Sequence, residues 1–194
     1  MYETEADLAR LQELIDASFA RSSEHLLSIM TPPRRLTARR LAQDLTGIAV
    51  LNVATVTARG EPRISALDGH FLHGRWYATT SGASPKVRQL RSRPGISAAY
   101  TPRDGYGVFC HGTTRFLQPG SDEYQVLTDH CVRVYGQSPL EWGSDIAFLT
   151  IEPSWFVGFA MTDAELAEIE AQKAERAAKA DSESGDSAQS AGEP

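Results

Sequence analysis

The sequence predicts an antiparallel β-barrel of the mainly β class, with short helices and a helical extension at each end. Between Ile48 and Ala160 the chain contains seven segments with the β-branched and aromatic composition of strands, most of them joined by short turns. The apolar content of 41% is that of a globular protein. Because closure removes exposed strand edges, we expect these strands to form a closed or nearly closed barrel.

The first 46 residues predict a helical extension. An amphipathic helix is expected over residues 4–30, with Thr4 and Asp7 as a capping pair. Its apolar residues recur at helical spacing: Leu8, Leu11, Ile15 and Phe19. Pro32 and Pro33 should end this helix, and Thr37 should cap a second, shorter one.

The predicted barrel domain covers residues 47–162. Its strands are expected at residues 48–57, 63–72, 75–80, 96–101, 106–117, 145–151 and 155–160. A short helix should begin at Ser84-Pro85 and stop before Pro94, and another should run from Asp122 to Tyr135. Residues 163–194 predict a charged helix as far as Lys179, followed by a tail of disordered composition.

Bulk properties exclude several function classes. A formal net charge of -6 argues against nucleic-acid binding, which favours a basic surface. Cys110 and Cys131 are too far apart for a CxxC metal or redox motif and suit a reducing compartment. His70 and His73 would point to opposite faces of a strand, so no metal site is predicted. Without a recognisable signal peptide or spanning segment, we expect a soluble cytoplasmic protein with no membrane partner.

The segment from Thr79 to Arg88 carries the clearest chemical signal. Hydroxyl residues end a predicted strand here. A loop of small residues follows and leads to the N-terminus of a predicted helix. Free N–H groups and the helix dipole favour an anion there. The side chains predicted to bind a phosphate are Thr79, Thr80, Ser81, Ser84, Lys86 and Arg88. The alternative is that Ser84 is only a helix cap and that the two cations are solvated.

Four segments in a particular order extend this signal. They are Arg63-Ile64-Ser65-Ala66-Leu67, Gly74-Arg75-Trp76-Tyr77-Ala78-Thr79-Thr80, Ser84-Pro85-Lys86 and Arg93-Pro94-Gly95-Ile96-Ser97. Together they are similar to the FMN-binding split barrel of the pyridoxamine-5′-phosphate-oxidase-like family, and to the related deazaflavin (F420)-dependent reductases of actinobacteria. The resemblance covers residues 45–160. Each motif is loose, but chance seldom produces this order and spacing.

The resemblance implies a split barrel that forms a homodimer with two cofactors at the subunit interface. Arg63 and Lys86 match family positions that meet the cofactor phosphate. The matching hydrogen-bond donors are Thr79, Thr80 and Ser84, and the strand that lies along the isoalloxazine ring is Ser65, Ala66 and Leu67. The vitamin-B6 oxidases carry a lysine where this chain has Asp68, and the family's Arg-containing C-terminal signature is missing. Both departures argue against oxidation of pyridoxamine phosphate.

The resulting expectation is a flavin- or deazaflavin-dependent oxidoreductase that transfers a hydride to or from a small molecule. FMN and F420 both remain open as cofactors, whereas haem is not expected. The alternative is a non-catalytic protein that stores or senses a flavin or haem on the same barrel. No catalytic pair can be assigned, and Trp142 and Trp155 are candidates for stacking on a ring.

Overall fold

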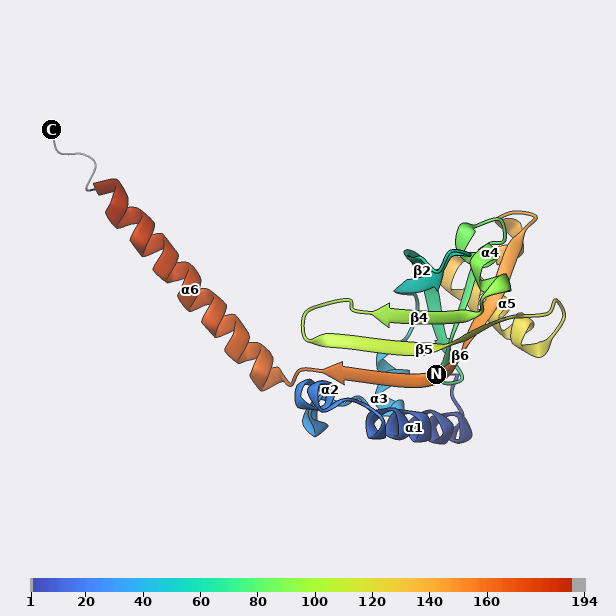
Figure 1. Ribbon diagram of the computed structural model, residues 1–194, viewed down its shortest axis with the longest axis horizontal. Coiled ribbons are helices and arrows are strands. Elements are labelled where there is room, and N and C mark those ends of the chain that lie inside the picture. Colours follow the sequence, from blue (N-terminus) through green and yellow to red (C-terminus); the bar gives the residue numbers. More distant parts are fainter. Residues whose placement is uncertain (1, 190–194) are drawn as a thin grey trace. The chain divides into compact units, whose positions relative to one another are not determined.

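Six antiparallel strands close into a barrel in the order β1-β2-β3-β6-β5-β4, with β4 returning to β1 (Figure 1). A computed structural model describes residues 2–189, with side chains described as far as residue 177. Within this part of the chain the strands are β1 Ala49–Val56, β2 Pro62–Leu72, β3 Arg75–Ser81, β4 Gly95–Tyr100, β5 Tyr106–Phe116 and β6 Ile146–Ala160. The predicted antiparallel barrel is therefore confirmed.

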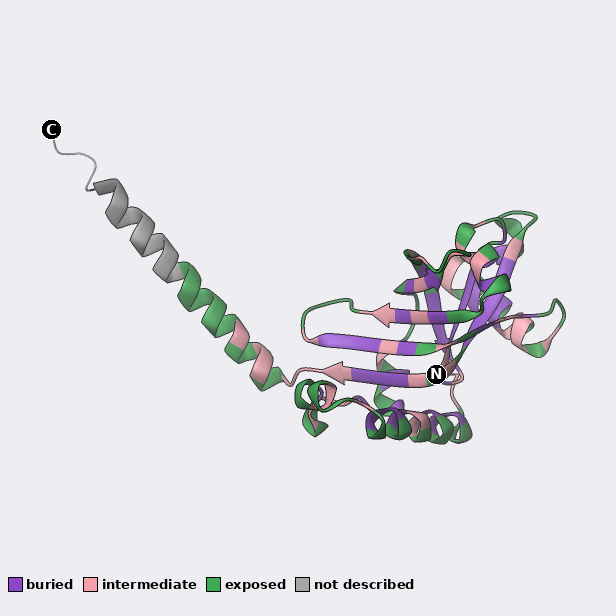
Figure 2. Ribbon diagram, viewed as in Figure 1, coloured by how far each residue is buried: buried purple, intermediate pink, exposed green. Residues whose placement is uncertain are grey.

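The register of the strands follows their hydrophobic pattern. Along β1 buried and more exposed residues alternate, and each faces a residue of β2, from Ala49 opposite Gly69 to Val56 opposite Pro62. A shift by one residue would turn every buried side chain of β1 outward, so the pattern holds the register. Figure 2 shows the burial concentrated in the strands and on one side of the first helix.

The prediction of two strands over residues 145–151 and 155–160 was wrong. The structure has one strand, β6, whose first part pairs with β3 as far as Thr150, while the strand as a whole also neighbours β5 in the barrel. Pro153 lies beyond the last residue paired with β3. A proline breaks a strand only where its missing N–H is needed for the ladder. Pro153 therefore lies within a continuous strand and does not end it.

The N-terminal extension consists of α1 Glu5–Ala20, α2 Glu24–Ile29, the 3-10 turn η1 Pro32–Arg34 and α3 Ala38–Asp44. The Thr4–Asp7 capping box and the Thr37 cap form as predicted. A single helix over residues 4–30 was not found, because the chain leaves the helix at Arg21 and restarts with Ser23 as a new cap. Serine satisfies a helix N-terminus better than it continues a helix.

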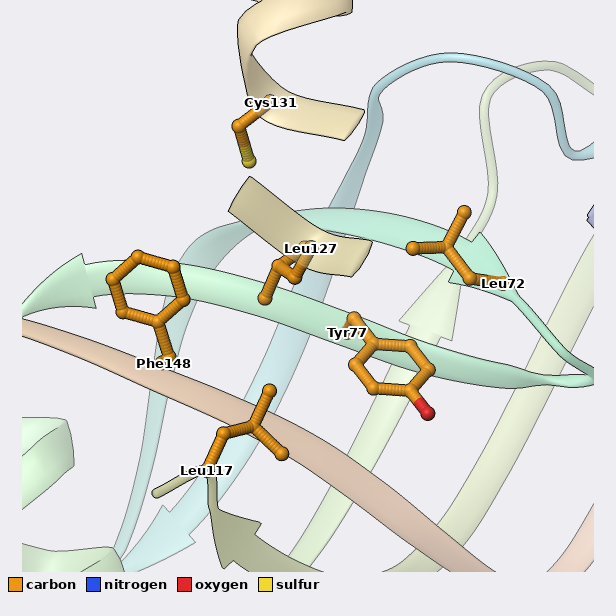
Figure 3. Close-up of a cluster of buried hydrophobic side chains, with 6 residues drawn as sticks. All are labelled: Leu72, Tyr77, Leu117, Leu127, Cys131 and Phe148. Atoms are coloured by element: carbon orange, nitrogen blue, oxygen red, sulfur yellow. The ribbon is translucent and has the colours of Figure 1, made fainter. Parts of the chain in front are cut away.

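Two helices cover openings of the barrel. Helix α4, Pro85–Ser92, buries Val87 and Leu90 and contacts β1. Helix α5, Asp122–Tyr135, is followed by the turn η2, Pro139–Glu141. It contributes Leu127 and Cys131 to a buried cluster, shown in Figure 3, whose other members are Leu72, Tyr77, Leu117 and Phe148.

The chain divides into two compact units, residues 1–159 and 160–194. In the second unit, α6 runs from Asp163 to Gln189, beyond the predicted end at Lys179. Extending a helix costs less than nucleating one, and residues 163–189 contain no proline to stop it. The last five residues of the predicted disordered tail, 190–194, lie outside the described residues. Among those described, no helix has both the length and the apolar character needed to cross a membrane.

Candidate functional site

Strands β2 and β3 and helix α4 together form a pocket of about 240 Å³. Its lining residues are Ala66, Leu67, Asp68, Thr79, Thr80 and Lys86. All of these except Asp68 belong to the set that the sequence predicts for cofactor binding. A larger hollow of about 490 Å³ lies beside α1, but none of the predicted site residues lines it.

Lys86 fixes a positive charge at this pocket. It stands in the first turn of α4, and its Nζ donates a hydrogen bond of 2.5 Å to the carbonyl oxygen of Ala66 on β2. Burial lowers the pKa of the Lys86 ammonium, and the Asp68 carboxylate partly opposes that effect. Because an ammonium has three donor hydrogens, the bond to Ala66 does not exhaust its capacity to bind an anion.

Two buried hydroxyl groups on the elements that form the pocket have no hydrogen-bond partner. They belong to Ser65 on β2 and to Ser84, the N-cap of α4, whose side chain does not bond to the helix as a cap usually does. Within the described residues the only other buried side-chain oxygen of this kind is that of Thr114. A buried hydroxyl without a partner is costly, so the Ser84 hydroxyl, at the start of α4, is available to a bound ligand.

Five of the ten predicted residues do not line the pocket: Arg63, Ser65, Ser81, Ser84 and Arg88. Arg63 is exposed and forms an ion pair of 2.8 Å with Glu61 at the preceding turn. Ser81 and Arg88 are also exposed. Arg88 lies two positions beyond Lys86, which turns it toward another side of α4. The structure thus separates Lys86 from the other cations that the sequence grouped with it.

The loop before α4 is closed on one side by Asp145. The backbone N–H of Gly82 donates to the Asp145 carbonyl oxygen over 2.9 Å. A Cβ atom added at Gly82 would lie only 2.1 Å from an oxygen of the Asp145 carboxylate. An anion approaching the helix N-terminus would be repelled from this side. The open approach is therefore from the pocket, past Lys86.

The pocket lies at the border of an outward-facing surface of the barrel. Cross-strand partners share one face of a sheet. One row of partners is Ile64, Ala54, Ser97 and His111, and the next is Ala66, Asn52, Ala99 and Phe109. We call these eight residues, with Val50, the outer face. Apolar side chains are exposed on it, with Ile64 77% and Val50 56% accessible.

The aromatic candidates from the sequence lie apart from the pocket lining. Trp155 on β6 stacks on His111 with ring centroids 4.7 Å apart, and His111 Nδ1 lies 2.8 Å from the hydroxyl of Ser97. Trp142 follows η2, and its ring meets the edge of Tyr135 at 5.0 Å. His111 and Trp155 thus belong to the surroundings of the outer face.

Sequence reasoning did not include Asp68 and Tyr135 in the site. Tyr135, the last residue of α5, donates a hydrogen bond of 3.2 Å to the carboxylate of Asp68, although the two are 67 positions apart. The replacement of a family lysine by Asp68 was visible in the sequence. No local pattern indicates that the end of α5 would reach β2.

Comparison with known proteins supports the fold. No protein-family model and no curated protein matches the sequence. Among solved structures, a FAD-binding protein from Mesorhizobium loti has a TM-score of 0.53 at 22% identity, covering 66% of this chain and 97% of that one. A conserved hypothetical protein from Mycobacterium tuberculosis has a TM-score of 0.56 at 15% identity, covering 68% and 89%. The haem storage protein HutZ from Vibrio cholerae has a TM-score of 0.50 at 17% identity, covering 63% and 93%. The chain has the split-barrel fold of the pyridoxamine-phosphate-oxidase-like proteins.

Proposed function

We propose that this chain is a flavin- or deazaflavin-dependent oxidoreductase that binds FMN or F420 at the pocket between β2, β3 and α4. The observation that carries the proposal is a pocket lined by Lys86, Thr79 and Thr80 at the start of α4, whose N-cap Ser84 has a hydroxyl without a partner. A phosphate requires such a combination of a charge with several donors. When bound, the cofactor supplies the hydride chemistry, and the protein binds, orients and shields it.

The residues present fit such a ligand. Lys86, Ser84 and the first turn of α4 would hold its anionic part. Ala66 and Leu67 on β2 offer an apolar wall for a flat ring, and Thr80 adds a hydroxyl. Asp68 stands on the same wall and is the one acidic side chain among the lining residues. The substrate is a small molecule that would contact the exposed side of the ring.

A second copy of the chain would complete the site. The pocket, at about 240 Å³, is smaller than the roughly 300–1,000 Å³ typical of sites that enclose a cofactor-sized ligand. The neighbouring outer face exposes Ile64 and Val50, which single chains usually bury or cover. We propose that two outer faces pack together in a homodimer, and that the partner subunit covers the ring of the cofactor.

Two further observations are consistent with this proposal. The solved structures of this fold include one protein that binds FAD and one that stores haem, both of them flat aromatic cofactors. Cys110 and Cys131 are free and buried, and burial raises the pKa of the Cys110 thiol to about 12. Inert, reduced thiols suit a cytoplasmic location.

The decisive experiment is an absorbance titration of the purified chain with FMN, F420 and haem. Binding of FMN or F420, followed by reduction and then reoxidation of the bound cofactor by an added acceptor, supports the oxidoreductase. Binding of haem alone, or a bound flavin that is reduced but that no acceptor reoxidises, favours the storage or sensing function. If none of the three ligands binds, the pocket has been misassigned.

A further inference from the structure

Four side-chain hydrogen bonds lead from the pocket through the protein to the N-terminal segment. The Tyr135 hydroxyl lies 3.2 Å from an Asp68 carboxylate oxygen and 3.3 Å from His70 Nε2. His70 Nδ1 lies 3.1 Å from His130 Nε2, and His130 Nδ1 lies 2.8 Å from the hydroxyl of Tyr2. The five residues come from β2, α5 and the segment before α1, so the connection exists only in the folded chain.

The tautomers with the proton on Nε2 of both histidines give these bonds one direction. Tyr135 has a single hydroxyl proton, which it donates to Asp68. In this tautomer His70 donates from Nε2 to the oxygen of Tyr135. A neutral His70 is left with Nδ1 as an acceptor, which requires a proton on Nε2 of His130. His130 Nδ1 then accepts from the hydroxyl of Tyr2, so all four donors point toward Asp68.

The surroundings keep the members of this chain neutral. Burial, and secondarily His130, lowers the pKa of His70 to about 4, while Asp68 and a hydrogen bond with the Gly47 backbone act against this. Burial, followed by Arg133, lowers the pKa of His130. Burial also raises the pKa of the tyrosines at both ends, and at Tyr135 the Asp68 carboxylate adds to the effect. Neutral histidines each have one donor and one acceptor nitrogen, as a directed chain requires.

We infer that the Asp68 carboxylate passes to the substrate a proton that the chain Tyr135–His70–His130–Tyr2 supplies from solvent. This inference rests on the proposed function. Reduction of an unsaturated substrate consumes one hydride and one proton. The reduced flavin or deazaflavin is the hydride donor, and the chain accounts for the proton.

The transfer balances atom by atom. The Asp68 carboxylate takes the hydroxyl proton of Tyr135 and passes a proton to the substrate atom that becomes electron-rich. Tyr135 is restored from His70 Nε2, and His70 receives at Nδ1 the Nε2 proton of His130. His130 Nδ1 takes the proton of Tyr2, which is restored from water. Both imidazoles then carry their proton on Nδ1, so the rings must reset before the next turnover.

A path through the protein is needed once the site is covered. In the single chain Asp68 is exposed and Tyr2 is partly exposed, whereas His70 is fully buried. A cofactor and a partner subunit on the outer face would close the route from Asp68 to water. Tyr2 lies at the far end of the chain of bonds, where water can still reach it.

The first test uses the unliganded protein. Long-range proton–nitrogen NMR spectra at pH 7 should show His70 and His130 both with the proton on Nε2. Tyr135→Phe removes one hydroxyl and should shift the Nε2 signal of His70. Tyr124→Phe is the matched control, because Tyr124 is also on α5 but stacks on Phe148 away from the chain, and it should leave both signals in place. A proton on Nδ1 of either ring at pH 7 would overturn the direction of the chain.

The second test measures proton delivery in the loaded protein. The reduced complex with FMN or F420, whichever binds, is mixed with menadione, a quinone that takes up a hydride and a proton, in H₂O and in D₂O. Loss of proton supply in Tyr135→Phe should slow reoxidation at least about tenfold and change the solvent isotope effect. Cofactor affinity should stay as in the wild type in both variants, whereas the melting temperature of Tyr135→Phe should fall because buried His70 loses a hydrogen-bond partner.

The outcomes separate the two proposals. If the cofactor binds and Tyr135→Phe reoxidises at the wild-type rate with the wild-type isotope effect, the proton path is wrong and the oxidoreductase stands. If no cofactor binds, the proposed function fails, and proton delivery to a hydride acceptor fails with it. A slow Tyr135→Phe variant that has also lost cofactor affinity would mean that the chain only supports the structure of the site.

Discussion

At the scale of residues, position on a short helix separates a binding cation from a solvated one. Lys86 and Arg88 are two positions apart on α4. Lys86 is half-buried and bonded to β2, whereas Arg88 is exposed. Successive residues of a helix point about 100° apart, so one face of α4 meets the pocket while the next meets solvent.

Replacing Lys86 with alanine should weaken cofactor binding. A hydrogen bond to a charged group contributes about 1.5–3 kcal/mol, which corresponds to roughly a tenfold to hundredfold rise in Kd. Titration of both proteins with FMN or F420, whichever binds the wild type, measures the change in Kd. Arg91→Ala changes another cation of α4 that does not line the pocket, and it should leave the Kd unchanged. Equal cofactor affinities of the wild type and Lys86→Ala would show that Lys86 does not bind the cofactor.

His70 should make the protein less stable in mild acid. Its pKa falls from 6.5 to about 4 on folding, because burial, with His130 next to it, disfavours the charged ring. Below pH 6.5 the unfolded chain therefore binds a proton that the folded one excludes until about pH 4. The contribution of neutral His70 to the free energy of unfolding is fully present above pH 6.5. It is lost as the pH falls from 6.5 to about 4, which lowers the free energy of unfolding by roughly 3 kcal/mol.

Urea unfolding between pH 4 and 8 measures this loss. The groups that face His70 are His130 and Tyr135 on α5 and Asp68 on its own strand. His70→Gln should flatten the slope of unfolding free energy between pH 6.5 and 4. His25→Gln, on the exposed side of α2, should keep the wild-type slope. If His70→Gln had the same slope as the wild type, the loss of stability in acid would not come from His70.

At the scale of elements, β5 and β6 approach each other closely at Gly112. A Cβ atom at Gly112 would lie 2.2 Å from the carbonyl oxygen of Glu152, a backbone atom that cannot swing away. Gly95, on the paired strand β4, has open space where its Cβ would be. A glycine in a strand often marks a close backbone contact. Gly112 marks one, whereas Gly95 does not.

Gly112→Ala should therefore destabilise the barrel by about 2–3 kcal/mol, since overpacking forces the backbone of β6 to move. Gly95→Ala is the matched control, and it should be neutral or slightly stabilising because alanine restricts the unfolded chain. Chemical denaturation of the two variants measures the difference. If Gly112→Ala and Gly95→Ala were equally stable, β6 would accommodate the added methyl group with no loss of unfolding free energy.

At the scale of the whole molecule, the proposed cofactor site and the outer face belong to one surface. Ala66 lines the pocket and is also a member of the outer face, opposite Asn52 of β1. Cofactor binding and dimer formation would thus be linked, because a ligand that binds the dimer more tightly than the monomer shifts the equilibrium toward the dimer.

Ile64→Glu should weaken the proposed dimer at least about tenfold, since it places a carboxylate from each copy in an apolar interface. Ile64 is the most exposed large apolar residue of the outer face, so the fold of the single chain should be preserved. Leu140→Glu is the control, because Leu140 is also exposed but lies on η2. Sedimentation over a dilution series, with and without FMN or F420, measures both. A wild-type chain that is monomeric and binds its cofactor at full strength would refute the interface site.

Local signals in the sequence were sufficient for the elements. The caps at Thr4 and Thr37, the Ser84-Pro85 start of α4 and the β-branched composition of β1 each act over a few neighbouring residues, and each appears in the structure. The interpretation of Thr79 to Lys86 as a binding segment had the same local basis, and its role stays a prediction. The break after α1 and the unbroken β6 were missed because weak local preferences competed there.

What the sequence by itself determined is the barrel class, most element boundaries and one half of the candidate site. Only the tertiary structure decided that Asp68 meets Tyr135 and that His70 meets His130. Propensities, caps and turns depend on residues within about one helical turn of each other. Contacts between residues 60 or more positions apart depend on how elements pack, which no local pattern encodes.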